Sequence, residues 1–362
     1  MIFHRYLKVE LEDQTHGPKY LAVFTSFRET LMKVPYNDAK SDEFKQKTAD
    51  EHSHSKFTAV LDSVSKLGVS LTDAATGKLN SSQGGVLSMW DVLSTQDSFM
   101  AGIMECQKAS RDVRGKKDAK EQHLREELKS KSFRSVKNGL CIPLPSAPHV
   151  LVCGVKVEST RMFKSALYPA LVEFYVCEER KLPTNMKRKT YKVMFKTGDD
   201  LRQDQLVIMM IKLMDRQLKR GTLDLCLKPY PILATSHTSG LVEFVEDSIP
   251  ISQILSSYNN SILHFFKTVA PCEHASHGVK QEVMQTYIRS CAGYCVITYL
   301  IGVGDRHLDN IMLQPTGHFF HIDFGFIFGR DPKPLPPAFR LTREVSIQCL
   351  VCLNLLIDRF LS

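Results

Sequence analysis

The stretch Gly302-Val303-Gly304-Asp305-Arg306-His307-Leu308-Asp309-Asn310 is followed, after a short interval, by His321-Ile322-Asp323-Phe324-Gly325. Between the two, short apolar runs at 311–313 and 318–322 flank Pro315-Thr316-Gly317, which predicts a β-hairpin with a proline-glycine turn. Asn310 and Asp323 then stand at the two ends of this hairpin and are able to face one magnesium ion. Phosphoryl transfer needs such an ion against the β- and γ-phosphates, so the pattern predicts a phosphotransferase.

The internal spacing of the first stretch supports the same chemistry. Asp305 precedes Asn310 by five positions, the separation that protein kinases use between the catalytic aspartate and the metal-binding asparagine. An isolated Asp-Phe-Gly is weak, because three common residues recur by chance and a glycine after a strand often marks only a turn. The combination is far more specific. The reversed Asp-Arg-His order and the absence of a glycine-rich loop disfavour a protein kinase.

Composition narrows the class of protein. The chain has 362 residues, 43% of them hydrophobic and 24% charged, which predicts a globular protein with two or three compact units. Much of its net charge of +8 comes from residues 103–138, where eleven basic residues outnumber six acidic ones. Because both signs are mixed there, the segment is typical of a solvated helix face or connector, and we expect no nucleic-acid partner.

The chain shows no signal-peptide pattern at its start and no apolar run long enough to cross a bilayer. We therefore expect a cytoplasmic protein. Its ten cysteines are too scattered for a disulfide scaffold, and in a reducing compartment most of them would be buried thiols.

The predicted secondary structure changes character near residue 140. Apolar residues recur at three- and four-residue steps over much of 56–109, which predicts helices, and Pro143, Pro145 and Pro148 then interrupt any helix. Beyond them the pattern predicts strands and two further helices. The strands are expected at 150–157, 171–177, 191–196, 231–235 and 241–245, and the helices at 205–218 and 282–301.

Four blocks of sequence closely resemble the phosphatidylinositol 3-kinase family, and most closely its class III, vacuolar-sorting type. The blocks are Phe195-Lys196-Thr197-Gly198-Asp199-Asp200-Leu201-Arg202-Gln203-Asp204, Cys291-Ala292-Gly293-Tyr294-Cys295-Val296-Ile297-Thr298-Tyr299, the stretch 302–310, and residues 321–337. The resemblance runs from about residue 5 to about residue 344.

This resemblance implies an α+β, two-lobed kinase-like fold with an incomplete C-terminal lobe, preceded by an all-α remnant of the family's helical domain. The implied segments are a helical part at 1–110, a charged linker at 111–145, a kinase N-lobe at 146–246, a partial C-lobe with the catalytic and activation loops at 247–344, and a divergent tail at 345–362. The chain is thus expected to be truncated at both ends, and helix 287–301 to expose apolar surface. The tail is either a short amphipathic helix or a product of gene-model error or alternative splicing.

The resemblance also implies ATP with Mg²⁺ or Mn²⁺ as cofactors. Lys196 resembles the lysine that meets the α- and β-phosphates, and the loop that contains Lys164 and Ser165 resembles the phosphate-covering loop. Asp204 resembles the acidic residue that organises the pocket, although helix capping is an alternative for it. Adenine-binding positions are implied at Met194, Tyr230, Phe244, Val245, Met312 and Ile322, where plain core residues are the alternative.

Catalytic and lipid-binding roles follow in the same way. Asn310 and Asp323 would hold the metal, and either Asp305 or His307 would accept the proton of the attacking hydroxyl. The loop after Asp323 carries only Arg330 and Lys333 as cations, which favours an inositol headgroup without extra phosphates.

The implied activity is transfer of the ATP γ-phosphate to the 3-hydroxyl of phosphatidylinositol, peripherally on endosomal and autophagic membranes. A pseudokinase-type regulatory subunit and a Beclin-type subunit are the implied partners. A phosphatidylinositol 4-kinase and an inactive nucleotide-binding or regulatory fragment are the alternatives.

Overall fold

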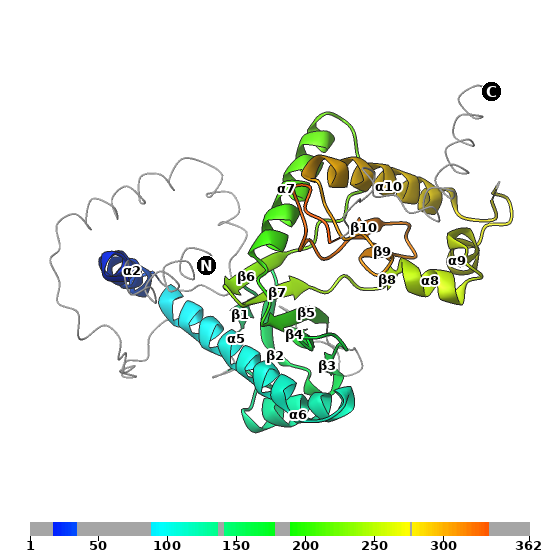
Figure 1. Ribbon diagram of the computed structural model, residues 1–362. Helices are drawn as coiled ribbons and strands as arrows, with labels where there is room; N and C mark the ends of the chain where they lie inside the picture. Colours follow the sequence, from blue (N-terminus) through cyan, green and yellow to red (C-terminus); the bar gives the residue numbers. More distant parts are fainter. Residues whose placement is uncertain (1–16, 35–87, 137–140, 178–188, 276, 333–362) are drawn as a thin grey trace. The chain divides into compact units, whose positions relative to one another are not determined.

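The computed structural model describes residues 17–34, 88–136, 141–177, 189–275 and 277–332 (Figure 1). The chain divides into two compact units, Met1–Gly198 and Asp199–Ser362. Both units combine α-helices with antiparallel strands, so the expected α+β, kinase-like class is confirmed. The segment limits implied by the sequence, including a first lobe that extends to 246, stay predictions.

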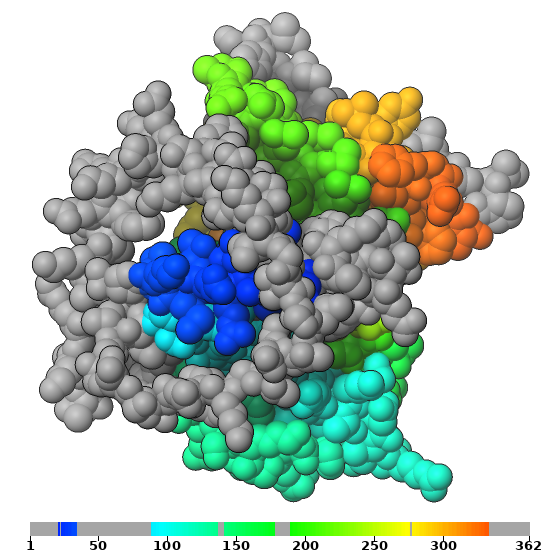
Figure 2. All heavy atoms as spheres, turned by 90° about the vertical axis from the view of Figure 1, so that its left-hand side faces the viewer, coloured from blue at the N-terminus to red at the C-terminus, as the bar shows by residue number. Residues whose placement is uncertain are grey.

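The first unit contains three described helices, α2 (Gly17–Met32), α5 (Met89–Asp112) and α6 (Lys117–Ser130). Helix α5 begins with a capping box, in which the Ser88 hydroxyl accepts from the Asp91 N–H at 3.2 Å and the Asp91 carboxylate accepts from the Ser88 N–H at 2.9 Å. Helix α2 contacts α5, and the blue atoms of α2 lie beside cyan atoms of α5 in Figure 2. The rings of Phe24 and Trp90, one from each helix, have centroids 5.7 Å apart. The predicted helical structure within 56–109 is confirmed from residue 89 onward by α5. Residues 56–87 lie outside the residues that the structure describes.

Helix α6 occupies the segment that the sequence suggested was a charged linker. Leu124 and Leu128 are fully buried on one side of it, while Gln122 and Glu126 are exposed on the other and share a hydrogen bond of 2.8 Å. The helix contacts α5 and the strand β3. The mixed charge pattern therefore belongs to a packed helix with one solvated face, because two leucines one turn apart provide the buried side.

The sheet of the first unit is antiparallel. Its strands run in the order β1-β2-β4-β5, with β3 paired to β4. Their bounds are β1 (Ile142–Pro143), β2 (Leu151–Val155), β3 (Arg161–Met162), β4 (Ala170–Val176) and β5 (Thr190–Thr197), and a short 3-10 helix, η2 (Val157–Ser159), follows β2. All three predicted strand regions before 197 are thus confirmed.

One face of β5 is buried and the other is more open. Val193, Phe195 and Thr197 are buried, and Phe195 packs against Phe174 of β4 at a centroid distance of 6.1 Å. Because side chains alternate along a strand, Met194 and Lys196 share the opposite face, where both are half-buried.

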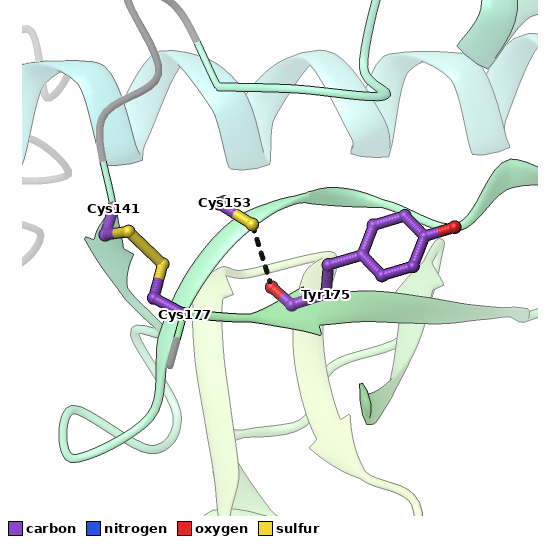
Figure 3. The surroundings of a disulfide bond; sticks show 4 residues. All are labelled: Cys141, Cys153, Tyr175 and Cys177. Atoms are coloured by element: carbon purple, nitrogen blue, oxygen red, sulfur yellow. Dashed lines mark hydrogen bonds between the residues drawn. A yellow bond between two sulfur atoms is a disulfide. The ribbon is translucent and has the colours of Figure 1, made fainter. Parts of the chain in front are cut away.

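Two cysteines of the first unit form a disulfide. Cys141 precedes β1 and Cys177 follows β4, and their Cα atoms lie 6.3 Å apart, a separation that suits a disulfide (Figure 3). Among the described free thiols, Cys106 and Cys291 are buried as expected, whereas Cys153, Cys226, Cys272 and Cys295 are partly exposed. The expectation of unpaired thiols is therefore wrong for the bonded pair, because the antiparallel order β1-β2-β4 brings together positions 36 residues apart in sequence.

The described part of the second unit contains four helices and five short strands, with a second core between them. Strands β6 (Ile232–Ser236) and β7 (Ser239–Glu243) form a hairpin, and β8 (Ile249–Pro250), β9 (Ile311–Leu313) and β10 (Phe319–His321) form a sheet in the order β10-β9-β8. The helices that the structure describes there are α7 (Arg202–Arg220), α8 (Ile251–Ser257), α9 (Ile262–Val269) and α10 (Gln281–Ile301). The predicted hairpin after residue 310 is confirmed.

Helix α10 packs on β10, and the buried rings of Tyr287 and Tyr294 both contact Phe319. Its outer side carries Val296, Tyr299 and Leu300, which are 53%, 50% and 66% exposed, in line with the apolar surface expected on this helix. Among the described helices, none combines the length and apolar character that a bilayer crossing requires.

Candidate active site

The loop that follows α10 begins at the point where this helix ends. Gly302 adopts a left-handed backbone with φ of 61°, and the Val303 N–H donates to the carbonyl of Thr298 at 2.9 Å, which closes the end of the helix. The residues 303–310 then lead into β9. Helix α10 and the β9–β10 hairpin, both packed in the core, therefore hold the two ends of this loop.

Arg306 organises the loop from inside. Its side chain is only 8% exposed and donates hydrogen bonds to four backbone carbonyls. The acceptors are Gly304 at 2.8 Å, Asn310 at 3.5 Å, Ile322 at 2.7 Å and, in the shortest contact, Asp323. The first two lie in the loop itself, and the last two lie at the end of the hairpin. One guanidinium thus joins the two stretches of sequence that predicted the site.

The positive charge of Arg306 is buried away from water, which is unfavourable for a charged group. Burial lowers the pKa of the guanidinium, while the nearby carboxylates of Asp323 and Asp305 act in the opposite direction. The guanidinium also lies over the ring of Phe324, with 5.6 Å from its central carbon to the ring centroid. Because arginine stays protonated in proteins, the site contains a fixed positive charge surrounded by oriented carbonyls.

Asn310 is placed by contacts on both its backbone and its side chain. It is 6% exposed, its carbonyl accepts from the Ile322 N–H at 3.0 Å, and its side-chain nitrogen donates to the carbonyl of Asp305 at 3.0 Å. The amide oxygen is the remaining side-chain acceptor and the atom that a magnesium ion would take as a ligand.

Asp323 stands at the other end of the hairpin with its side chain exposed. Its backbone is left-handed with φ of 60°, and its carboxylate accepts from the Gly325 N–H at 3.3 Å. Asp305 has the same unusual backbone, with φ of 48°, and its N–H donates to the carboxylate of Asp331 at 3.0 Å. Aspartate tolerates this backbone region better than most residues, and such positions concentrate at functional sites.

Asp204 lies in the first turn of α7 and contacts the Asp-Phe-Gly segment. Its carboxylate accepts from the N–H of Phe324 at 3.0 Å, and the neighbouring Gln203 donates to the carbonyl of Phe324 at 2.7 Å. The N-cap position of α7 is Leu201, which makes no side-chain capping bond. Asp204 therefore orders the segment after Asp323, and its position in the first turn of α7 is the one that the capping alternative also describes.

His307 differs from these residues because its side chain is 48% exposed. Its Nδ1 accepts from the Asp309 N–H at 3.3 Å, while the Asp309 carboxylate is bonded to the hydroxyl of Ser252. The alternative that His307 is a buried core residue is thus contradicted. Its role as the proton acceptor, like that of Asp305, stays a prediction.

The phosphate-contacting residues expected from the sequence lie in the first unit. Lys196 is half-buried near the end of β5, and Lys164 and Ser165 are exposed in the turn between β3 and β4. The turn is closed by a hydrogen bond from the Phe163 N–H to the carbonyl of Pro169 at 2.9 Å. The predicted meeting of Lys196 with Asn310 and Asp323 stays a prediction.

The adenine-binding positions expected in the second unit differ in burial. Tyr230 is 5% exposed and packs against Phe320 at 6.0 Å, and burial raises the pKa of its hydroxyl well above the usual value. Val245 is also buried, and its carbonyl accepts from the Ser248 hydroxyl at 2.6 Å. Phe244, Met312 and Ile322 are half-buried, as is Met194 in the first unit.

Of the two expected lipid-contacting cations, Arg330 is exposed and Lys333 lies outside the described residues. Reasoning from the sequence did not assign a role to Arg306 or to Asp331, although both organise the loop. The signal present in the sequence is a cation that lies between two acidic residues, Asp305 and Asp309. That signal does not show which carbonyls the cation binds, because they belong to residues up to 17 positions away.

Comparisons with known proteins show which sequences this chain is similar to. Residues 190–348 match the family model of phosphatidylinositol 3- and 4-kinases. The chain is 43% identical over 257 residues to phosphatidylinositol 3-kinase VPS34 of Arabidopsis thaliana. The aligned region covers 71% of this chain and 30% of the relative.

Two fungal proteins show similar identity. Phosphatidylinositol 3-kinase VPS34 of Saccharomyces cerevisiae is 48% identical over 56% of this chain and 22% of its own length. Phosphatidylinositol 3-kinase pik3 of Schizosaccharomyces pombe is 41% identical over 78% of this chain and 34% of its own length. The chain thus spans about a third or less of the curated relatives it matches. The matched region, residues 190–348, carries the kinase domain of the phosphatidylinositol 3- and 4-kinase family.

Proposed function

We propose that this chain carries the catalytic region of a lipid kinase that transfers the γ-phosphate of ATP to the 3-hydroxyl of phosphatidylinositol. The observation that supports this most is the set of contacts through which Arg306 joins the 302–310 loop to Asp323. The similarity to phosphatidylinositol 3-kinases over 56–78% of the chain supports the choice of lipid and of the 3-position.

The donor atoms near Arg306 suit a magnesium ion. Asn310 offers an amide oxygen and Asp323 an exposed carboxylate, and Mg²⁺ prefers one or two protein oxygens together with substrate phosphates. When bound, the ion would neutralise charge that develops between the β- and γ-phosphates. Asn310 is held for this task by its bond to the Asp305 carbonyl, and Mn²⁺ would suit the same oxygen donors.

In this proposal the nucleotide is bound by residues from several strands and loops. Lys196 supplies a compact positive charge to the α- and β-phosphates, and the turn with Lys164 and Ser165 covers them. The adenine ring would lie near the backbone of Phe244 and Val245, and Asp204 would keep the Asp-Phe-Gly segment in place. The proton of the lipid hydroxyl would pass to Asp305 or to His307.

The cellular setting is proposed from the same resemblance. Phosphatidylinositol 3-phosphate made by such an enzyme would serve endosomal sorting and autophagy, with the enzyme peripheral on those membranes. Arg330 and Lys333 would contact the lipid headgroup. A pseudokinase-type regulatory subunit and a Beclin-type subunit are the proposed partners.

A lipid-kinase assay on the 362-residue chain tests the proposed activity. The chain is incubated with labelled ATP, Mg²⁺ and phosphatidylinositol vesicles, and the product isomers are separated. Label at position 3 supports the proposal. Label at position 4 would establish a phosphatidylinositol 4-kinase, and nucleotide binding without labelled lipid would establish a non-catalytic fragment.

Variants of the chain show whether the measured lipid-kinase activity belongs to this chain or to a contaminating kinase. We expect Asn310→Ala to lower turnover at least 100-fold at saturating ATP, whereas Glu273→Gln, an exposed acidic position between α9 and α10, leaves it unchanged. His307→Ala and Asp305→Asn are then compared for loss of turnover with retained ATP binding. Unchanged turnover in one of the two would remove that residue as the base.

A further inference from the structure

Two pieces of the first unit that the proposed function assigns to the nucleotide phosphates are both bonded to one buried side chain. The side chain is that of Gln107 on α5, which is 0% exposed. The first piece is the turn at 163–169 between β3 and β4, which contains Lys164 and Ser165. The second piece is the end of β5, where Thr197 directly follows Lys196.

Gln107 uses both ends of its amide group. Its Nε2 donates to the carbonyl of Tyr168 at 2.9 Å and to that of Leu167 at 3.4 Å. Its Oε1 accepts from the hydroxyl of Thr197. A buried amide must be satisfied by partners of this kind, so the pairing fixes the turn and the strand end with respect to the same helix.

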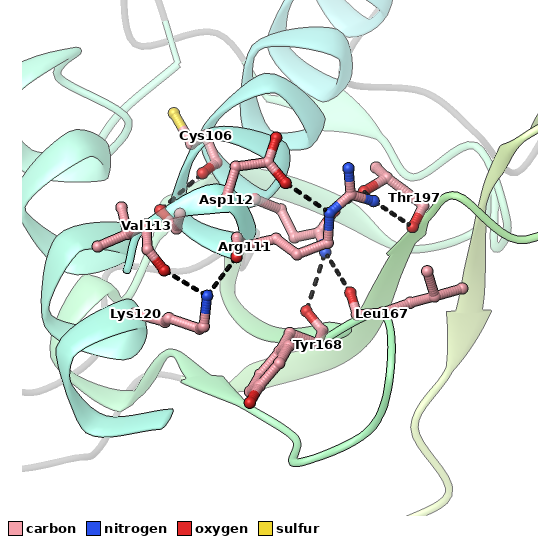
Figure 4. Close-up of polar contacts among 10 residues, drawn as sticks. Cys106, Arg111, Asp112, Val113, Lys120, Leu167, Tyr168 and Thr197 are labelled. Carbon is pink, nitrogen blue, oxygen red and sulfur yellow. Dashed lines mark hydrogen bonds and ion pairs between the residues drawn. The ribbon is translucent and has the colours of Figure 1, made fainter. Parts of the chain in front are cut away.

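The surrounding residues hold each of these partners in place. Arg111, one turn further along α5, donates to the Thr197 carbonyl at 3.0 Å (Figure 4). Lys120 of α6 donates to the carbonyls of Arg111 and Val113 at the end of α5, and its ammonium lies 4.9 Å from the centroid of the Tyr168 ring. Tyr168 itself has a left-handed backbone with φ of 44°.

The contacts with Lys120 have a chemical rationale. The last carbonyls of a helix lack partners within the helix and carry partial negative charge, so a cation is favoured there. Lys120 is only 8% exposed, so water has little access to the two carbonyls that it bonds. If the ammonium moved away, these carbonyls would stay buried without a partner, which is unfavourable. Helices α5 and α6 thus form a rigid support behind the strand end and the turn.

We propose that Gln107 is a positioning residue for nucleotide binding. It sets the turn that contains Lys164 and Ser165 with respect to Lys196, so that both meet the phosphates of one nucleotide. This inference rests on the proposed function, since those three residues are the ones assigned there to the phosphates. Gln107 itself touches no substrate.

The chain offers a matched control on the same helix. Gln96 is also buried in α5, at 1% exposure, but its Nε2 is bonded to the carbonyl of Pro143 in β1, away from the turn and from β5. Gln107→Leu and Gln96→Leu therefore make the same chemical change in the same helix. Only the first removes the link between the turn and the end of β5.

The test measures binding of a fluorescent ATP analogue with Mg²⁺ by the full chain, beside hydrogen exchange of residues 163–169. We expect Gln107→Leu to weaken nucleotide binding about tenfold and to speed exchange in the turn, since each lost hydrogen bond of this kind contributes roughly 1 kcal/mol. Gln96→Leu should change neither quantity by more than about twofold, even if it lowers thermal stability to the same extent.

A milder pair of variants applies if Gln107→Leu does not fold. Thr197→Val removes only the hydroxyl that Gln107 accepts from, and Thr197→Ser restores it. We expect the valine variant to weaken nucleotide binding and the serine variant to bind like the unmodified chain. In steady-state kinetics the change should appear in the KM for ATP and not in the KM for lipid.

The outcomes distinguish this inference from the proposed activity. Equal nucleotide affinity of the Gln107→Leu variant and the unmodified chain, or an equal loss in Gln96→Leu, would overturn the role of Gln107 even if lipid is phosphorylated. Nucleotide binding without lipid product would overturn the proposed activity instead, and the affinities would still decide the role of Gln107. No nucleotide binding by the unmodified chain would overturn both.

Discussion

The guanidinium of Arg306 donates to the backbone carbonyl of Asp323, 17 residues further along the chain. The same guanidinium holds the carbonyls of Gly304 and Ile322. The contact orients the residue that would bind the metal without using its carboxylate, which stays exposed. The side chain that places the metal ligand is therefore distinct from the ligand itself.

Replacing Arg306 with lysine should separate charge from geometry. Lysine keeps the positive charge, but a single ammonium cannot reach carbonyls on both sides of the loop, so at least two of them lose their partner. We expect a loss of roughly 2–4 kcal/mol in the free energy of unfolding and at least a 100-fold lower kcat. Urea unfolding and the lipid-kinase assay measure the two effects.

The control for this change is Arg289→Lys. Arg289 is exposed on α10, and lysine is expected to replace it with no change in stability or turnover. Wild-type turnover in the Arg306→Lys variant would contradict the role given to the four carbonyl contacts.

Gly304 should not tolerate a side chain. A Cβ atom built there would lie 2.2 Å from the carbonyl oxygen of Arg330 and 3.0 Å from the carboxylate of Asp331. Its N–H also donates to the carbonyl of Phe326 at 2.7 Å, so the loop cannot move away without losing this bond. We expect Gly304→Ala to cost roughly 1–3 kcal/mol of stability and to lower turnover.

Thermal unfolding of Gly304→Ala is compared with that of Gly221→Ala. Gly221 is the C-cap of α7 and has a φ of −83°. A Cβ atom added there would lie 3.4 Å from the nearest atom, the carbonyl oxygen of Leu218, so alanine fits. A Gly304→Ala protein as stable and active as Gly221→Ala would show that the close approach to Arg330 is not needed.

Because of His321, the free energy of unfolding should decrease at acidic pH. The ring is buried and stacked on Tyr294 at 5.5 Å, and burial, together with the charge of Arg306, lowers its pKa to about 3. Between that value and the usual 6.5, the unfolded chain binds a proton that the folded chain does not. The contribution of His321 to stability therefore falls as pH decreases through this window, by up to roughly 1.4 kcal/mol per pH unit.

Replacing His321 with phenylalanine should remove this contribution. The midpoint of urea unfolding is measured from pH 7 to pH 4 for both proteins, and the variant is expected to show the shallower dependence. His274→Gln, a change at an exposed position between α9 and α10, is the control and should follow the unmodified chain. Parallel curves for His321→Phe and the unmodified chain would be inconsistent with a neutral buried ring.

The disulfide between Cys141 and Cys177 should make the first unit sensitive to reductant. It closes a loop of 36 residues, and a bond of this span is worth about 3–4 kcal/mol through restriction of the unfolded chain. We expect dithiothreitol to lower the unfolding midpoint of the unmodified chain but not that of a Cys141→Ser, Cys177→Ser double variant.

The control for the disulfide is Cys153→Ser. Cys153 lies nearby and makes only a weak contact of 3.6 Å from its sulfur to the carbonyl of Tyr175 (Figure 3). This variant should keep the response to dithiothreitol. Two alkylatable thiols at positions 141 and 177 in the protein before reduction would contradict the bond.

Local patterns were sufficient for most of the elements. Apolar spacing located α7, a long apolar segment located α10, and short runs of β-forming residues located β4 and β5. The Pro315-Thr316-Gly317 turn located the β9–β10 hairpin. These features depend on neighbours a few positions apart, so the physical rules that govern them can be read directly along the chain. The charged segment now known as α6 was harder, because its two buried leucines provide only a narrow apolar side.

The sequence by itself determined which residue types the site contains and their order along the chain, since Asp305, Asn310 and Asp323 belong to a spacing that few chemistries require. Only the tertiary structure decided what holds them: the carbonyls bound by Arg306, the Phe324 N–H bound by Asp204, and the pairing of Cys141 with Cys177. The reason is that backbone carbonyls and N–H groups are the same in every residue. The partner of a given backbone group therefore depends on where folding places that group. It cannot be predicted from the order of side chains along the chain.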